Sequence, residues 1–226
     1  MLAYLSQNAD KRIFDALRQE GFKAIPLAAF DVLEAPVDTH ADMLLLNVGD
    51  LVFVHKDYKI DLSALENVIQ IDEPMGTKYP HDVLLNIAIV GKNVFANTKN
   101  ASKTVLEYLE KQGFCIHHVA QGYAHCSTCI VGENAIISAD RGIIEAAQKA
   151  NVDALQIDEG HICLSPYNHG FIGGSCGSYK DKIYFCGSLD SHPNGNGIRD
   201  FCLKHGKKVI ELCNTPLIDI GGILFK

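Results

Sequence analysis

The chain has 226 residues, of which 47% are hydrophobic and 21% are charged, so we expect a globular protein with a sizeable core. Its formal net charge of −7 argues against nucleic acid as a partner, because a phosphate backbone is bound by clustered lysine and arginine side chains. The sequence has no export signal and no apolar run of the roughly 18 residues that cross a bilayer, so no membrane partner is expected. We therefore expect a cytoplasmic protein whose eight cysteines are reduced.

The N-terminal segment predicts a strand, a helix and a second strand, in MLAYLSQ, residues 10–19 and FKAIPL. Four strand pairs follow at similar spacing, each with apolar, strand-forming residues on both sides of a short turn. These pairs are DMLLLNVGDLVFV (42–54), DVLLNIAIVGKNVFAN (82–97), CSTCIVGENAIISAD (126–140) and GGSCGSYKDKIYFCG (173–187). The turn glycines Gly49, Gly91 and Gly132 are 42 and 41 residues apart, so the repeating unit has about forty residues.

Each strand pair is followed by a segment with helical periodicity and then by a short strand. The four segments are residues 62–67 with VIQI, 102–112 with FCIHHV, 141–150 with ALQI and 197–205 with KVIEL. Ser102 and Asp140 directly precede their helices and are predicted N-caps. Each repeat is therefore a β-β-α-β unit.

The chain ends in a fifth strand pair, PLIDIGGILFK, which has no helix after it. The strand, helix and strand at the N-terminus supply the missing parts, so that five units would close into a ring without exposed sheet edges. We therefore predict an α/β fold, a five-bladed α/β propeller closed by the two termini, with one domain over residues 1–226. The alternative is an open α/β sheet built from the same pieces.

A ring of five β-β-α-β units resembles the pentein fold, and the resemblance covers the whole chain. That fold is shared by guanidine-modifying enzymes, namely arginine and agmatine deiminases, dimethylarginine hydrolases and amidinotransferases, and by a ribosomal-subunit anti-association factor that is not an enzyme. The chain is also similar to small bacterial proteins of this fold to which no activity is assigned. The resemblance implies a ligand site in the central channel, toward which the first strand of each blade points.

In the enzymes of this fold, a cysteine nucleophile follows a Gly-Gly pair in the last blade, a histidine lies in the middle blade, and carboxylates of early blades hold the guanidinium. Two carboxylates suit the guanidinium group, which is planar and permanently charged. The cysteine thiolate attacks the central carbon of the guanidinium, and the histidine transfers a proton to the departing amine. The resemblance assigns the carboxylates to Asp42 and Asp82 and the histidine to His125. It fails in the last blade, where the glycines of DIGGILFK are followed by no cysteine.

Cys176 is the cysteine that the sequence offers as a replacement nucleophile. It follows the double glycine of GFIGGSCG (170–177), one blade earlier than the resemblance would put it. His40 and His81 stand beside the two aspartates in neighbouring repeats, which favours a polar ring at the mouth of the channel. We therefore predict a catalytic pair and a set of substrate-binding residues. The catalytic pair is Cys176 and His125, and the substrate-binding residues are Asp42, Asp82, His40 and His81.

Each assignment has a structural alternative. Cys176 also suits a glycine-rich strand where blades pack closely, and aspartates at strand starts commonly bond nearby backbone. A metal site on His125, Cys126 and Cys129, completed by a further histidine or Cys176, is disfavoured because residues three apart in a strand face opposite sides. We therefore expect no metal and no cofactor. The remaining cysteines are predicted to be buried packing: Cys115, Cys163, Cys186, Cys202 and Cys213.

The sequence thus predicts a protein that binds a small polar ligand, with a guanidinium group as the leading candidate, in its central channel. If the protein is an enzyme, the predicted reaction is that of a Cys/His-dependent hydrolase or amidinotransferase. The alternative is a non-catalytic binding or interaction protein on the same fold, which predicts no fast-reacting thiol and an exposed apolar face. The substrate and the oligomeric state stay open.

Overall fold

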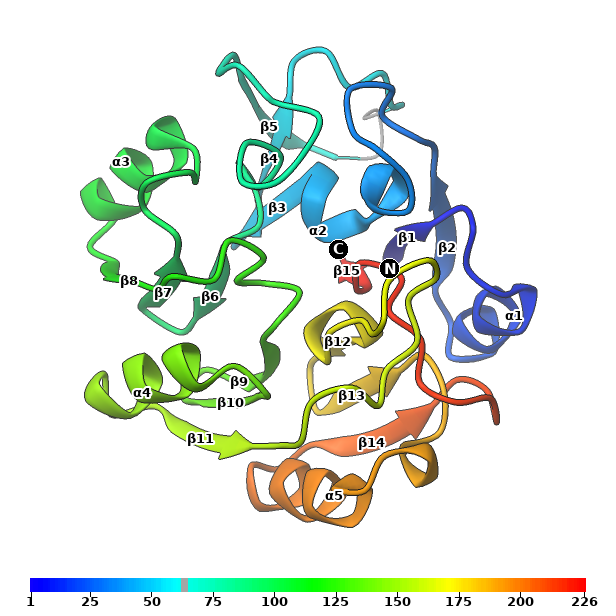
Figure 1. The fold of residues 1–226 in the computed structure, drawn as a ribbon. Helices are drawn as coiled ribbons and strands as arrows, with labels where there is room; N and C mark the ends of the chain where they lie inside the picture. Colours follow the sequence, from blue (N-terminus) through cyan, green and yellow to red (C-terminus); the bar gives the residue numbers. More distant parts are fainter. Residues whose placement is uncertain (62–64) are drawn as a thin grey trace.

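The computed structural model describes residues 1–61 and 65–226, which form five three-stranded sheets arranged in a ring (Figure 1). In every sheet the first strand pairs antiparallel with the second, and the second pairs parallel with the third. Each sheet is one blade, and the blades are numbered here in chain order of their first strands. This arrangement confirms the predicted five-bladed propeller of β-β-α-β units.

The strands have the following bounds. Blade 1 contains β3 (Leu45–Val48), β4 (Leu51–His55) and β5 (Asn67–Ile71); blade 2 contains β6 (Ala88–Val90), β7 (Asn93–Ala96) and β8 (Cys115–His118). Blade 3 contains β9 (Cys129–Gly132), β10 (Ala135–Ser138) and β11 (Asp153–Gln156); blade 4 contains β12 (Cys176–Tyr179), β13 (Lys182–Phe185) and β14 (Lys208–Glu211). Blade 5 contains β15 (Leu224–Phe225), β1 (Leu2–Ser6) and β2 (Lys23–Leu27).

In four blades a helix connects the second strand to the third. These helices are α1 (Lys11–Gln19), α3 (Lys103–Lys111), α4 (Arg141–Lys149) and α5 (Gly195–Lys204). Short helical segments precede three of these elements. Val37–Thr39 and α2 (Ala41–Leu44) precede β3, Gly173–Ser175 precedes β12, and Leu189–Ser191 precedes α5. The helix predicted over 62–67 falls partly on 62–64, which lie outside the described residues, and β5 already begins at Asn67.

Helices α1, α3 and α4 each follow a residue whose side chain accepts a hydrogen bond from a free backbone N–H of the first turn, whereas the Asn194 side chain before α5 makes no such bond. The Ser102 side chain accepts a hydrogen bond from the Val105 N–H, and Asp140 accepts from Ile143, which confirms both predicted N-caps. Buried residues four apart, such as Val105 and Leu109 in α3, turn one face of each helix toward its sheet. Helices α3 and α4 thus pack between their own blade and the preceding one.

The two ends of the chain close the ring in blade 5. Ala3 pairs with Phe225 and Tyr4 with Leu224, so β15 is antiparallel to β1. The Lys226 N–H donates to the Leu2 carbonyl at 2.9 Å, and both termini lie near the middle of the ring (Figure 1). Because β1 is hydrogen-bonded on both sides, the first and last segments form one sheet.

The glycines of GFIGGSCG lie where three blades meet. A Cβ at Gly173 would collide with backbone carbonyls of residues 125–128 in blade 3, and one at Gly174 would collide with the Asp219 carboxylate ahead of β15. Gly173 and Gly174 are therefore needed for close packing. The strand that the motif was expected to form begins only at Cys176, because the glycines occupy the short helical turn Gly173–Ser175.

All eight cysteines are free thiols. The prediction that Cys115 and Cys163 are buried is wrong: both are exposed, and Cys115 begins β8, the outer strand of its blade. Within residues 1–61 and 65–226, no helix is long and apolar enough to cross a membrane.

Candidate functional site

Two cavities lie near the centre of the ring. The channel cavity, of about 210 Å³, has a largely apolar wall to which Asp42, His125 and Cys176 also belong. The mouth cavity, of about 660 Å³, is larger and more polar. Its lining includes the carboxyl-bearing residues Glu34, Asp82 and Asp219 and the aromatic residues Tyr79, Tyr123, Tyr167 and Phe171. His40 and Cys126 line the mouth cavity and Asp42 the channel cavity, so these three residues stand between the two.

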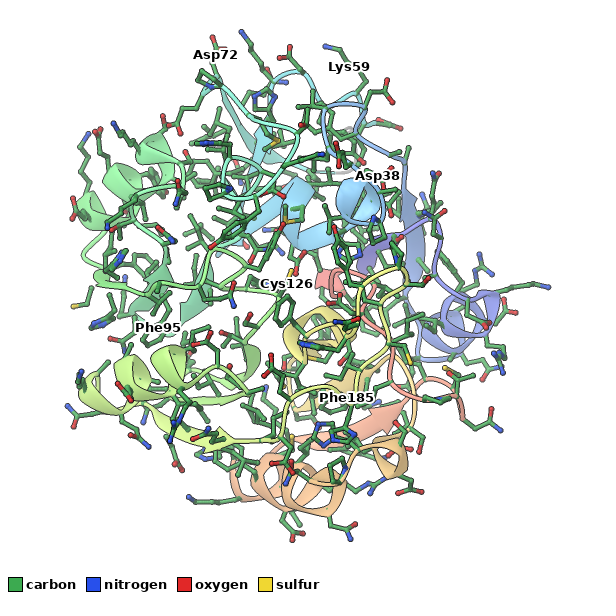
Figure 2. All side chains as sticks on the ribbon, viewed as in Figure 1. Asp38, Lys59, Asp72, Phe95, Cys126 and Phe185 are labelled. Carbon is green, nitrogen blue, oxygen red and sulfur yellow. The ribbon has the colours of Figure 1, made fainter. Side chains whose placement is uncertain are left out.

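Asp42 lies at the centre of a buried polar cluster. Short helix α2 places Asp42 just before β3, and the Asp42 side chain is only 1% exposed. Oδ2 of Asp42 accepts a hydrogen bond from the Cys126 thiol at 2.7 Å and lies 3.4 Å from Nδ1 of His125. Cys126 itself lies near the middle of the ring (Figure 2). Asp42 therefore joins blade 1 to blade 3 through its side chain rather than capping its own strand.

The Cys126 thiol is held in its protonated form by its surroundings. Burial raises the pKa of Cys126 well above its ordinary value, and the nearby carboxylates of Asp42 and Asp219 raise it further. Because the thiolate is the nucleophilic form, Cys126 is a weak nucleophile in this state.

Asn86 fixes the position of His125 and Cys126. Its Oδ1 accepts hydrogen bonds from the backbone N–H groups of His125 at 2.8 Å and Cys126 at 3.2 Å. Its Nδ2 lies 3.1 Å from Sγ of Cys126 and donates to it. Sequence reasoning missed Asn86, because a single asparagine before a strand gives no signal that its side chain reaches the next blade.

Asp219 connects the last segment of the chain to the GFIGGSCG motif. Its two carboxyl oxygens accept from the backbone N–H groups of Phe171 and Gly221, each at 2.9 Å. Oδ1 also lies 3.9 Å from Nδ1 of His40. Burial raises the pKa of Asp219, although His40 and the two N–H donors oppose the shift. Asp219 was not predicted, but its place two residues ahead of the Gly-Gly pair of the last blade was a readable signal.

Asp82 forms the acidic end of the mouth cavity. It is 2% exposed, and its Oδ2 accepts a hydrogen bond from the Tyr123 hydroxyl at 2.7 Å. Oδ1 of Asp82 has no hydrogen-bond partner among the described residues. Burial raises the pKa of Asp82, and the bond from Tyr123 only partly offsets this.

Aromatic rings continue from Asp82 along the mouth cavity. The Tyr123 ring packs against Tyr79 at 5.3 Å and against Phe171 at 6.2 Å between ring centroids. Tyr79 and Tyr167 are 50% and 55% exposed, so the aromatic lining reaches the protein surface. The loop of Tyr167, Asn168 and His169 forms part of the cavity wall.

The predicted site residues are only partly brought together. Asp42 and His125 are in contact, and Asp82 and His40 line the mouth cavity. His81 is exposed, is absent from the lining of both cavities, and accepts through its backbone carbonyl from the Gly76 N–H, as a turn residue does.

Cys176 has a mainly apolar environment. Its thiol contacts the Gly173 carbonyl at 3.7 Å and packs in the core cluster that holds Cys129 and Cys202. Burial, followed by contact with Cys176, raises the pKa of Cys129. Within the described part of the chain, the polar contacts of Cys176 and of His125 do not include each other. The Cys176–His125 catalytic pair stays a prediction.

The buried charge of Asp82 gives the free protein a specific pH dependence. A carboxyl whose pKa is higher in the folded than in the unfolded state binds more protons when folded, so its contribution to stability falls as pH rises above about 4. We expect Asp82→Asn to stabilise the ligand-free protein by about 1 kcal/mol near neutral pH, because a neutral amide replaces a buried, half-partnered charge. The measurement is thermal unfolding of both proteins over a pH series. The gain should shrink toward about pH 4, and a gain independent of pH would contradict the assignment.

Several solved enzymes have an architecture similar to that of this chain. A mutant of dimethylarginine dimethylaminohydrolase from Pseudomonas aeruginosa, complexed with citrulline, matches with TM-score 0.58 and 11% identity over 93% of this chain and 91% of that one. Agmatine deiminase from C. jejuni matches with TM-score 0.56 and 11% identity over 93% and 86%. An amidinotransferase of the saxitoxin biosynthetic pathway from Microseira wollei matches with TM-score 0.55 and 9% identity over 93% and 78%.

These likenesses, together with the five blades around a central cavity, define the chain as a protein of the pentein fold and confirm that prediction. No curated protein sequence matches the chain. The sequence model of one family, described as "Family of unknown function (DUF6873)", matches residues 4–224. The chain belongs to this family.

Proposed function

We propose that the protein binds a small organic cation, of the guanidinium class, in the mouth cavity. The observation that carries the proposal is Asp82, a buried carboxyl with one oxygen that has no partner in the described residues, set at the end of an aromatic wall. A buried carboxyl oxygen without a partner is costly unless a ligand completes it. A cationic N–H donor is the partner that would compensate the charge as well as the missing hydrogen bond.

The aromatic side chains support a cation rather than a neutral polar ligand. Tyr123, Tyr79 and Phe171 line one cavity, and the ring faces of aromatic residues attract ammonium and guanidinium groups. Burial, followed by the neighbouring Asp82 carboxyl, raises the pKa of Tyr123, so its hydroxyl remains a donor to Oδ2 of Asp82. That bond leaves Oδ1 as the carboxyl oxygen without a hydrogen-bond partner in the described residues.

The charge balance of the cavity points the same way. Glu34 is paired with Lys78 at 3.3 Å, whereas Asp82 and Asp219 form no ion pair with a lysine or arginine of residues 1–61 and 65–226. The predicted binding residues His40 and Asp42 lie deeper, beside Asp219 and Cys126. We assign His40 to the floor of the mouth cavity; Asp42 lines the channel cavity and His81 lines neither, so their substrate-binding roles stay predictions. The enzymes of similar fold, whose names include agmatine and dimethylarginine, fit a guanidinium ligand for this pocket.

The test is binding of arginine and agmatine, each compared with the neutral analogue citrulline, by isothermal titration calorimetry. We expect the guanidinium compounds to bind and citrulline to bind more weakly. Asp82→Asn should weaken guanidinium binding by about 10- to 100-fold, which is the worth of one charge-assisted hydrogen bond. Asp200→Asn, which removes the same charge from an exposed position on α5, is the matched control and should bind as the parent does.

Equal affinity of Asp82→Asn and the parent, or citrulline binding as tightly as arginine, would overturn the proposal.

The same ligands separate the enzyme from the non-catalytic binding protein. Turnover that is lost in Cys176→Ala would support the predicted Cys176–His125 pair and a hydrolase or transferase. Binding without turnover would support the non-catalytic alternative, with a small molecule as the partner. A cytoplasmic location remains part of the proposal, supported by eight free cysteines.

A further inference from the structure

We propose that His40, Asp42 and Cys126 form a binding site for a zinc ion between the mouth cavity and the channel cavity. A ring nitrogen of His40, a carboxyl oxygen of Asp42 and Sγ of Cys126 all lie within 4.8 Å of one another. The three side chains come from α2, the residue before it, and the turn ahead of β9, and all are buried. The inference does not depend on the proposed cation binding, which rests on Asp82 and the aromatic wall.

Two of the three residues carry polar atoms that the described protein leaves unpartnered. Oδ1 of Asp42 and Nδ1 of His40 have no hydrogen-bond partner in residues 1–61 and 65–226. Their side chains are 1% and 3% exposed, so solvent contributes little. Buried polar atoms are nearly always satisfied, and here two unsatisfied ones lie within the same small cluster. A metal ion placed among the three residues would give both side chains a partner.

The donor set selects the metal. One thiol, one imidazole and one carboxyl are the ligands of zinc sites, whereas magnesium and calcium take oxygen ligands almost alone. Three protein ligands leave one tetrahedral position for water or another small ligand. Zinc bond lengths and a tetrahedral angle put ligand atoms roughly 3.6 Å apart. The 2.7 Å contact from Sγ of Cys126 to Oδ2 of Asp42 therefore has to widen, and no pair of ligand atoms has to close by more than about 1.2 Å, since all lie within 4.8 Å of one another.

Zinc binding would remove the proton from the Cys126 thiol. The Sγ–H bond of Cys126 breaks as sulfur donates an electron pair to zinc, and the proton passes to the buffer. The Cys126 thiolate and the Asp42 carboxylate then balance the two positive charges of the zinc ion. The negative charge of Asp82 in the mouth cavity is therefore not neutralised by the metal. No oxidation or reduction is involved.

Neighbouring groups already support such ligands. Nδ2 of Asn86 donates to Sγ of Cys126, which would stabilise the thiolate, and Oδ1 of Asn86 accepts from the backbone N–H of Cys126 at 3.2 Å. Groups in these positions commonly orient the ligands of metal sites. The motif that suggested a metal in the sequence, Cys126 with Cys129, does not contribute jointly, because Cys129 belongs to the separate core cluster around Cys176.

The test is titration of the chelator-treated full-length protein with zinc chloride, by calorimetry in buffers of different ionisation enthalpy. We expect one zinc per chain and release of about one proton near pH 7. Cys126→Ser and Asp42→Asn should each weaken binding by more than about 100-fold, which exceeds the effect expected of a residue that only orients ligands. Cys163→Ser, at an exposed cysteine, is the matched control and should bind as the parent does.

Cobalt(II) bound to the unmodified protein gives a second readout that needs no variant to fold. We expect a sulfur-to-metal charge-transfer band and the intense visible bands of a tetrahedral site. Absence of stoichiometric binding, parent-like zinc affinity of a folded Cys126→Ser, or a cobalt spectrum without thiolate character would each overturn the proposal. Asp82→Asn should retain zinc affinity, so loss of cation binding and loss of metal binding are distinguishable.

Discussion

Gly221→Ala is expected to lower the thermal unfolding midpoint by roughly 10 °C, the scale for a loss of about 3 to 4 kcal/mol in a chain of this length. Gly221 has a φ of +75°, where a Cβ costs about 1–2 kcal/mol. The new Cβ would also collide with the Cβ and Cα of His40, and forcing an extra carbon into a packed region costs about 1–3 kcal/mol more. Calorimetry or circular dichroism measures the midpoint.

Gly206→Ala is the matched control for this effect. Gly206 has a φ of +71°, and no atom lies within 4 Å of the position its Cβ would take. Gly206→Ala should therefore show the backbone strain alone, with a smaller fall in the midpoint. If the two variants unfold at the same temperature, the close contact between the last segment and His40 is refuted.

Asp219→Ala is expected to cost about 3 kcal/mol of unfolding free energy. The truncation leaves the backbone N–H groups of Phe171 and Gly221 buried without an acceptor, and each such group costs about 1–3 kcal/mol. The release of a buried charge offsets part of that loss. Chemical denaturation with urea measures the difference, and its midpoint should shift without a change of slope.

Asp200→Ala, on the exposed side of α5, serves as the control and should change stability by less than about 0.5 kcal/mol. Asp219→Asn should fall between the two, because the amide keeps one acceptor and loses the charge. A stability of Asp219→Ala within error of the control would mean that the carboxyl does not hold the GFIGGSCG segment in place.

The fold was predictable because the repeat is visible in the sequence. Turn glycines at intervals of 42 and 41 residues, together with helix caps at Ser102 and Asp140, set the unit and its boundaries. Closure of the ring by the two termini was predictable because the last strand pair has no helix after it, while the N-terminal segment supplies a strand, a helix and a second strand. The short helices α2 and Gly173–Ser175 were not predicted, because segments of three or four residues carry no periodicity.

The site was predictable only in part. Asp42 and His125 were expected at the channel and are in contact across 83 positions of sequence. Cys176 was chosen because it follows two glycines, but sequence does not reveal where a thiol points after a helical turn, and here it packs in the core of its blade region. Asn86, Tyr123 and Asp219 act across blade boundaries, and their roles depend on neighbours that no local pattern specifies.

The most direct test of cation binding is a crystal structure of the protein soaked with the guanidinium compound that binds most tightly. We predict the guanidinium group within hydrogen-bond distance of Oδ1 of Asp82, with its plane against the Tyr123 ring. Its absence from the mouth cavity under saturating conditions, or its binding at another place on the molecule, would contradict the proposed function.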